Sequence, residues 1–162
     1  MKLIAEHIDS QISLLSEAAQ GGQSKSYLHG IFMQAEKPNR NKRRYPRAVL
    51  APAVDKYIKE QVNTGRAVGE LNHPDGPTVN LDKVSHRITE LKWDGNNVVG
   101  KALILDTPMG KIVKGLMEGG VQLGVSTRGM GSLKSAKDGI MEVAEDFILA
   151  TVDIVQDPSA PE

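Results

Sequence analysis

Residues 84–105 read VSHRITELKWDGNNVVGKALIL, and this stretch decides the fold class. Apolar and polar residues alternate on both sides of the central Asp-Gly-Asn-Asn, which is typical of β-strands. An Asp-Gly pair between two such runs favours a tight turn that joins antiparallel strands. The stretch therefore predicts a β-hairpin that turns at residues 94–97.

Other segments predict further strands. Residues 26–36 (SYLHGIFMQAE) are rich in strand formers, with Gly30 as a candidate bulge, and residues 140–155 are also strand-like. Strands follow strands more often than strand–helix–strand units occur. We therefore expect an α+β fold with mostly antiparallel pairing.

Two segments carry helix signals. Residues 47–63 repeat apolar side chains at helical spacing, with Pro52 near the first turn, where proline is tolerated. In residues 107–120, Thr107 is expected as the N-cap and Pro108 as the first helical residue. Both segments predict helices that flank the strands.

The N-terminal segment predicts a separate arm. Apolar residues recur there at intervals of three and four, which favours an amphipathic helix over residues 3–19: Ile4, Ile8, Ile12, Leu15 and Ala19. The glycine pair at 21–22 then predicts a flexible joint. We therefore divide the chain into a flexible or helical arm, residues 1–25, and a main domain, residues 26–162.

Composition excludes several classes of function. The chain has 162 residues, with 20 Lys plus Arg against 20 Asp plus Glu, so no global charge favours nucleic acid or an anionic membrane. Cysteine is absent, which rules out disulfides, thiolate metal sites and thiol catalysis. Apolar runs are too short to span a membrane. We expect a soluble protein without a cofactor.

Residues 121–133 (VQLGVSTRGMGSL) contain a candidate nucleophile, Ser126. The stretch lacks the lysine of a phosphate-binding loop and the second glycine of a Gly-x-Ser-x-Gly elbow. Small residues around Ser126 nevertheless allow a substrate carbonyl to approach. The backbone N–H groups of Arg128 and Gly129 are candidates for stabilising an oxyanion. The alternative is a strand-end serine bonded to the backbone.

A serine nucleophile needs a base, and His73 is the leading candidate among the four histidines. It lies in the turn-rich segment GELNHPDG, whereas His29 and His86 lie within expected strands and His7 lies on the arm. The histidines show no metal-binding spacing such as His-x-x-x-His, so we expect no metal site.

Four blocks, in this order, resemble the prohead proteases of large tailed phages: GIFMQAEKPNRNKRRYPRAVL, AVGELNHPDGP, GVSTRGMGSL and VDIVQDPSAPE. These capsid-maturation serine endopeptidases are related in fold to herpesvirus assemblin. The resemblance implies a β-barrel-like core flanked by helices, with His73 as the base and Ser126 as the nucleophile. It also implies a self-associating zymogen inside the assembling prohead, in the host cytoplasm, that cleaves scaffold proteins, capsid proteins and itself.

The third member of the site is less directly indicated. Assemblins use a second histidine after the serine, but no histidine follows His86 here. Asp153, a carboxylate among apolar neighbours, is our candidate to orient His73 and to stabilise its imidazolium. The alternatives are a solvent-facing Asp153, with Glu145, Asp146 or Glu70 in its place.

The resemblance also implies cleavage after Ile/Leu-x-Glu. Such triplets include Ile4-Ala5-Glu6, Leu15-Ser16-Glu17 and Leu116-Met117-Glu118, and the first two, on the arm, are the better placed for self-processing.

The basic run at residues 39–47 supports two competing functions. One is a non-enzymatic capsid or scaffold assembly module that uses this loop and the arm. The other is a nucleic-acid contact, which the neutral composition disfavours. A solvated loop with salt bridges is the simplest interpretation of these residues.

Overall fold

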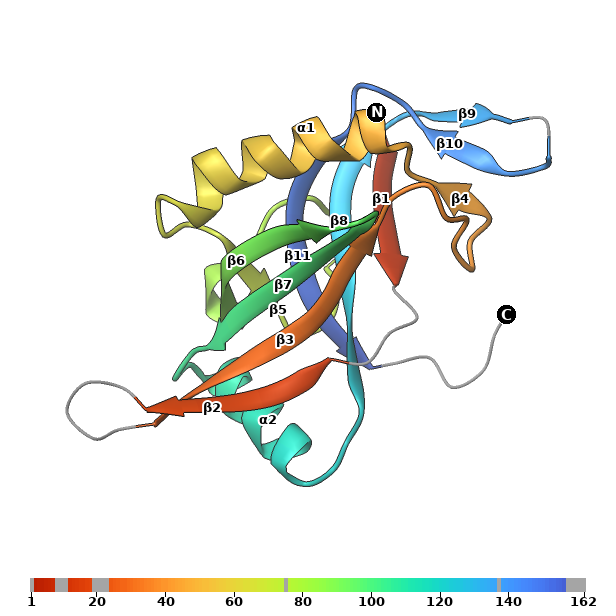
Figure 1. Ribbon diagram of the computed structural model, residues 1–162. Helices are drawn as coiled ribbons and strands as arrows, with labels where there is room; N and C mark the ends of the chain where they lie inside the picture. Colours follow the sequence, from red (N-terminus) through yellow and green to blue (C-terminus); the bar gives the residue numbers. More distant parts are fainter. Residues whose placement is uncertain (1, 8–11, 19–23, 75, 137, 157–162) are drawn as a thin grey trace.

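The computed structural model describes residues 2–7, 12–18, 24–74, 76–136 and 138–156. Its strands are β1 (Lys2–His7), β2 (Ser13–Ala18), β3 (Ser24–Gln34), β4 (Arg43–Arg44), β5 (Val68–Glu70), β6 (Val84–Asp94), β7 (Asn97–Ile104), β8 (Leu123–Gly131), β9 (Leu133–Ser135), β10 (Met141–Val143) and β11 (Ile148–Gln156). The helices are α1 (Arg47–Tyr57), extended by a π-turn (Ile58–Val62), a 3-10 turn (Leu81–Lys83) and α2 (Pro108–Glu118). Figure 1 shows α1 across one end of the sheets and α2 near the other.

The hairpin predicted from residues 84–105 is confirmed. Strands β6 and β7 pair antiparallel up to Asp94 and Asn97, and Gly95 in the turn has a φ of 61° that suits glycine. They belong to a five-stranded sheet of order β2-β3-β7-β6-β5. The expected strand at residues 26–36 is β3, but its bulge lies between Ile31 and Met33 rather than at Gly30.

A second sheet, of order β1-β8-β11, carries the candidate nucleophile. Strand β8 is the middle strand and pairs antiparallel with both neighbours. A small third sheet, of order β4-β10-β9, lies beside it (Figure 1). The expected α+β fold with mostly antiparallel strands is therefore confirmed, although the described strands form three sheets and not a closed barrel.

The helix predicted over residues 3–19 is wrong, because β1 and β2 occupy its described part. Ile4 and Glu6 are buried whereas Leu3 and Ala5 are only half-buried, so burial follows the two-residue period of a strand. A spacing of four residues fits both a helix and a strand, and pairing with β8 and β3 decides for the strand. The expected joint at residues 21–22 lies outside the described residues.

Both other helices form where the sequence predicts them. Thr107 caps α2 by accepting a hydrogen bond from the Gly110 N–H at 3.0 Å, and Pro108 is the first residue of the helix. Because α1 begins at Arg47, Pro52 lies in its second turn and not near the first. No helix among the described residues is long and apolar enough to cross a membrane.

Candidate active site

Three residues far apart in the sequence meet on one face of the β1-β8-β11 sheet. His73 Nε2 lies 2.7 Å from the hydroxyl oxygen of Ser126, and His73 Nδ1 lies 2.7 Å from Asp153 Oδ2. Ser126 and Asp153 are register partners on β8 and β11, so their side chains point to the same side of the sheet. The sequence named all three as candidates, and the fold brings them together.

The direction of the two hydrogen bonds follows from their chemistry. An ionised carboxylate can only accept hydrogen bonds, so the Nδ1 of His73 must carry the hydrogen that is donated to Asp153. The Nε2 of neutral His73 is then free of hydrogen and accepts the hydroxyl proton of Ser126. This tautomer is the one that a general base for Ser126 requires.

The loop that carries His73, residues 71–74 and 76–80, is fixed to the edge of β11. Leu71 forms an isolated parallel bridge with Ile154, and the Asn72 N–H donates to the Ile154 carbonyl at 2.7 Å. Asn72 has a φ of 70°, in the left-handed region that asparagine tolerates better than most residues. This backbone turn aims the next residue, His73, back over the sheet.

Asp153 is completely buried, and four hydrogen bonds saturate its carboxylate. Oδ2 accepts from His73 and from Arg128 Nε at 2.7 Å, while Oδ1 accepts from Arg128 Nη2 at 3.1 Å and from the Glu70 N–H at 2.9 Å. Burial by itself raises the pKa of Asp153, but these bonds and the charge of Arg128 outweigh it and lower the pKa. Asp153 is therefore held as the carboxylate.

The alternatives to Asp153 have other partners. Asp146 accepts hydrogen bonds from Ser132, and Glu145 pairs with Lys134 at an exposed position. Glu70 is buried in the same cluster as Asp153 but bonds Arg128 and Asn80 and not His73. Asp153 is thus the described carboxylate that hydrogen-bonds His73.

Arg128 and Gly129 lie in the middle strand of the sheet. Arg128 pairs with Ala5 on one side and with Thr151 on the other, and its side chain is buried against Asp153. A Cβ added to Gly129 would lie 2.5 Å from the Phe147 ring, so this glycine makes room for a core aromatic. A role for their backbone N–H groups at an oxyanion stays a prediction.

Comparison with known proteins assigns the chain to a family. Residues 5–162 match the family described as the prohead core protein serine protease. This chain belongs to that family. A curated relative, the prohead core protein protease of Enterobacteria phage T4, is 45% identical over 142 residues, which are 84% of this chain and 66% of the relative. The chain therefore spans just under two thirds of the length of that relative.

A solved phage protease has the same fold. The structure of the bacteriophage T4 capsid assembly protease, gp21, matches with a TM-score of 0.91 and 36% sequence identity. The match covers 97% of this chain and 98% of that structure, so the architecture in Figure 1 is common to both.

The surroundings of His86 differ from those of His73. His86 is buried, and burial lowers its pKa, so it is neutral. Its Nε2 donates to the Val152 carbonyl at 2.7 Å, and its Nδ1 accepts from the Ser85 hydroxyl. His86, on β6, therefore forms a hydrogen bond to β11 that passes across the edge strand β5. In the described part of the chain, no group of three or more His, Asp or Glu residues could hold a metal ion.

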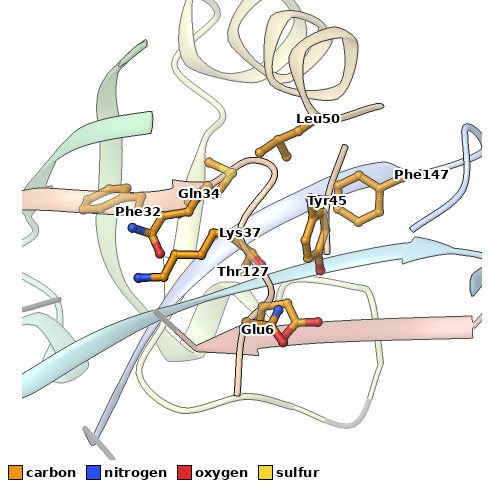
Figure 2. A pocket seen from close by; sticks show the side chains of 10 residues that line it. Glu6, Phe32, Gln34, Lys37, Tyr45, Leu50, Thr127 and Phe147 are labelled. Carbon is orange, nitrogen blue, oxygen red and sulfur yellow. The ribbon is translucent and has the colours of Figure 1, made fainter. Parts of the chain in front are cut away.

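A pocket lies on the face of the β1-β8-β11 sheet that is opposite to Ser126. Figure 2 shows Thr127, the neighbour of Ser126, together with Tyr45 and Glu6 in its wall. Since successive residues of a strand point to opposite faces, Thr127 points away from the Ser126 side. This pocket thus backs onto the candidate site and does not open into it.

Three arginines of the basic run at residues 39–47 are bound within the chain. Arg43 pairs with Glu6, and Arg44 binds Glu142 at 2.8 Å. Arg47 donates to the Gly95 carbonyl and stacks on Trp93, with its guanidinium carbon 4.1 Å from the ring centroid. The loop therefore ties strands and a turn together.

Proposed function

We propose that this chain is a serine endopeptidase of phage head maturation. Ser126 is the nucleophile, His73 the general base and acid, and Asp153 the group that orients His73. One observation carries the proposal: the continuous path of hydrogen bonds from the Ser126 hydroxyl through His73 to a buried carboxylate, each 2.7 Å long. Membership of the prohead protease family supports the assignment.

Acylation follows from this geometry. The Ser126 oxygen attacks the carbonyl carbon of the scissile bond while its proton moves to His73 Nε2, and the negative charge of Asp153 stabilises the imidazolium. As the tetrahedral intermediate collapses, the C–N bond breaks and His73 gives its proton to the departing amine. The product is an ester between the substrate acyl group and Ser126.

Deacylation repeats these steps with water. His73 takes a proton from a water molecule whose oxygen attacks the ester, and it then returns the proton to the Ser126 oxygen as the C–O bond breaks. Ser126 is only 1% exposed, whereas the His73 side chain is 25% exposed. Substrate and water therefore reach the hydroxyl on the side where His73 meets solvent.

Scaffold and capsid proteins are the proposed substrates, with cleavage after Ile/Leu-x-Glu inside the prohead in the host cytoplasm. Self-processing by the same rule is favoured at Leu15-Ser16-Glu17, because β2 is an edge strand and Leu15 is 39% exposed. Ile4-Ala5-Glu6 lies in β1 with Ile4 and Glu6 buried, so β1 must leave β8 before this triplet can be cut.

The competing assembly module is less well supported. It requires the basic run at residues 39–47 to face a partner, yet Arg43, Arg44 and Arg47 each bind groups of this chain. An assembly module also does not explain why one histidine is hydrogen-bonded both to a serine and to a buried carboxylate. Self-association, which the family resemblance implies, stays a prediction.

The decisive experiment compares the intact chain with Ser126→Ala on a peptide that contains Ile-x-Glu. We expect cleavage on the carboxyl side of Glu by the wild type and a loss of about 10³-fold or more in kcat for the variant. Ser135→Ala is the matched control, since Ser135 is exposed and bonds the sulfur of Met141. Equal cleavage by the wild type and Ser126→Ala would overturn the proposal.

A further inference from the structure

We propose that the buried side chain of Arg128, together with Glu70, is a positioning device that fastens Asp153 and the His73 loop to each other. This inference rests on the proposed function and adds two residues that act through the triad. Neither Arg128 nor Glu70 touches the Ser126 hydroxyl among the described hydrogen bonds, so both act on the reaction through Asp153 and His73.

The first observation is that the guanidinium of Arg128 has no unused donor. Nε and Nη2 hold the two oxygens of Asp153 at 2.7 and 3.1 Å, and Nη2 also donates to Glu70 Oε2 at 3.2 Å. Nη1 donates to the carbonyls of Gly76 and Thr78 at 2.9 and 3.0 Å. All five N–H groups of an arginine are thus committed, and the side chain is fully buried.

The second observation is which parts of the fold these bonds join. Asp153 lies on β11 and Glu70 ends β5, while Gly76 and Thr78 belong to the loop that carries His73. Glu70 holds the far end of the same loop, because its Oε2 accepts from the Asn80 N–H at 3.0 Å. Arg128 therefore sets the distance between the strand that carries Asp153 and the loop that presents His73.

The third observation is the charge of the cluster. Two carboxylates, Asp153 and Glu70, share one guanidinium, which leaves an excess of one negative charge in a buried site. When His73 takes the proton of Ser126, the imidazolium cancels that excess. Because charges interact strongly when they are shielded from water, this balance favours the protonated form of His73 that acylation needs.

Two further titratable groups in the described part of the chain interact with the cluster, and both are uncharged. Tyr57 on α1 interacts with Asp153 and Arg128, and burial raises its pKa to about 12. His86 on β6 interacts with Asp153, and burial lowers its pKa. Both are neutral near neutral pH, so among the described side chains around Asp153 the balance is set by Arg128, Glu70 and His73.

Two variants separate positioning from charge balance. Arg128→Lys keeps the positive charge but cannot form the two-point grip on Asp153 and the two bonds to the loop. Glu70→Gln keeps the shape and an oxygen that accepts from Arg128, but removes one negative charge. The matched controls are Arg44→Lys and Glu142→Gln, which alter a more exposed Arg–Glu pair at 2.8 Å.

The readout is the rate at which diisopropyl fluorophosphate labels Ser126 in the full chain, measured across pH. We expect Arg128→Lys to lower the plateau rate by about 10-fold or more, since a small misplacement of reacting groups is costly. We expect Glu70→Gln to move the acid midpoint of the profile to lower pH by about half a unit, because protonated His73 loses a neighbouring negative charge. The controls should match the wild type in both respects.

The outcomes distinguish the two proposals. A wild-type chain that is not labelled at Ser126 overturns the proposed function and this inference with it. Labelled wild type with an unchanged plateau in folded Arg128→Lys, or with an unchanged midpoint in Glu70→Gln, overturns this inference alone. If Arg128→Lys fails to fold, the midpoint of Glu70→Gln still decides, because a purely structural role would not shift it.

Discussion

Ser126 on β8 and Asp153 on β11 are register partners, and the imidazole of His73 joins their side chains. Opposed residues of neighbouring strands present their side chains on the same face of a sheet, so one imidazole above that face can hydrogen-bond both of them. The sheet therefore fixes the positions of Ser126 and Asp153, and the loop after β5 has to place only the imidazole of His73 between them.

Replacing Asp153 tests the orienting role. In Asp153→Asn the amide no longer requires a hydrogen on Nδ1 of His73, so the productive tautomer loses its support. We expect kcat for peptide cleavage to fall by about 10⁴-fold. The variant also leaves Arg128 with a weaker partner, so its unfolding should be followed in parallel.

Asp146→Asn is the control for that variant, because Asp146 bonds Ser132 at an exposed position. It should retain wild-type kcat. Asp153→Asn with unchanged kcat in a folded chain would contradict the role assigned to Asp153.

The backbone of Asn72 offers a second test, because its φ of 70° is costly for a β-branched residue. Asn72→Gly should leave cleavage within about three-fold of the wild type, since glycine adopts this conformation readily. Asn72→Val should lower kcat by about 10-fold or more, because the loop must relax and carry His73 away from Ser126. Peptide cleavage assays on both variants make the comparison, and a Val variant as active as the Gly variant would contradict it.

The sequence predicted the elements whose signals are local. The turn at residues 94–97 and the Thr107 cap depend on neighbouring residues alone, so they could be found without knowledge of the fold. Local surroundings made His73 and Ser126 candidates, and the resemblance to prohead proteases made them the leading ones. Asp153 was selected as a carboxylate among apolar neighbours.

The parts that the sequence did not predict depend on distant partners. Strand β1 was mistaken for a helix because a spacing of four fits both, and its pairing with β8 lies beyond any local signal. The side chain of Arg128 finds Asp153 25 positions away and Glu70 58 positions away. In the sequence, Arg128 is a charged residue within an otherwise apolar or small-residue strand. Such a charge implies a buried partner, but the sequence does not indicate which residue that partner is.

Gly69 tests the support of β11 by His86. A Cβ at this position would lie 2.3 Å from the Val152 carbonyl oxygen and 2.4 Å from His86 Nε2, so the bond between them must give way. We expect Gly69→Ala to lower the free energy of unfolding by about 2 kcal/mol or more. Gly115→Ala is the control, since nothing lies within 4 Å of a Cβ added there. Gly115 is in α2, where alanine should raise the free energy of unfolding by about 0.5–1 kcal/mol. Denaturant unfolding of both variants measures the difference, and equal stabilities would contradict it.

Glu6 on β1 makes stability depend on pH with a predictable sign. Burial raises its pKa, and the charge of Arg43 and the hydrogen bond from Asn41 offset this only in part. The folded chain therefore binds the Glu6 proton more tightly than the unfolded chain does. The stability that this provides is present at pH below the ordinary range of the acid and is lost as pH rises through the raised pKa.

Glu6→Gln isolates this effect, because glutamine keeps the shape of the protonated acid at every pH. We expect the free energy of unfolding of the wild type, minus that of Glu6→Gln, to fall as pH rises from about 4 to 7. In an Arg43→Gln background the fall should be larger, because the neighbouring charge that lowers the pKa of Glu6 is gone. Denaturant unfolding at a series of pH values gives both curves. A difference that rises with pH would mean that Arg43 and Asn41 outweigh burial at Glu6.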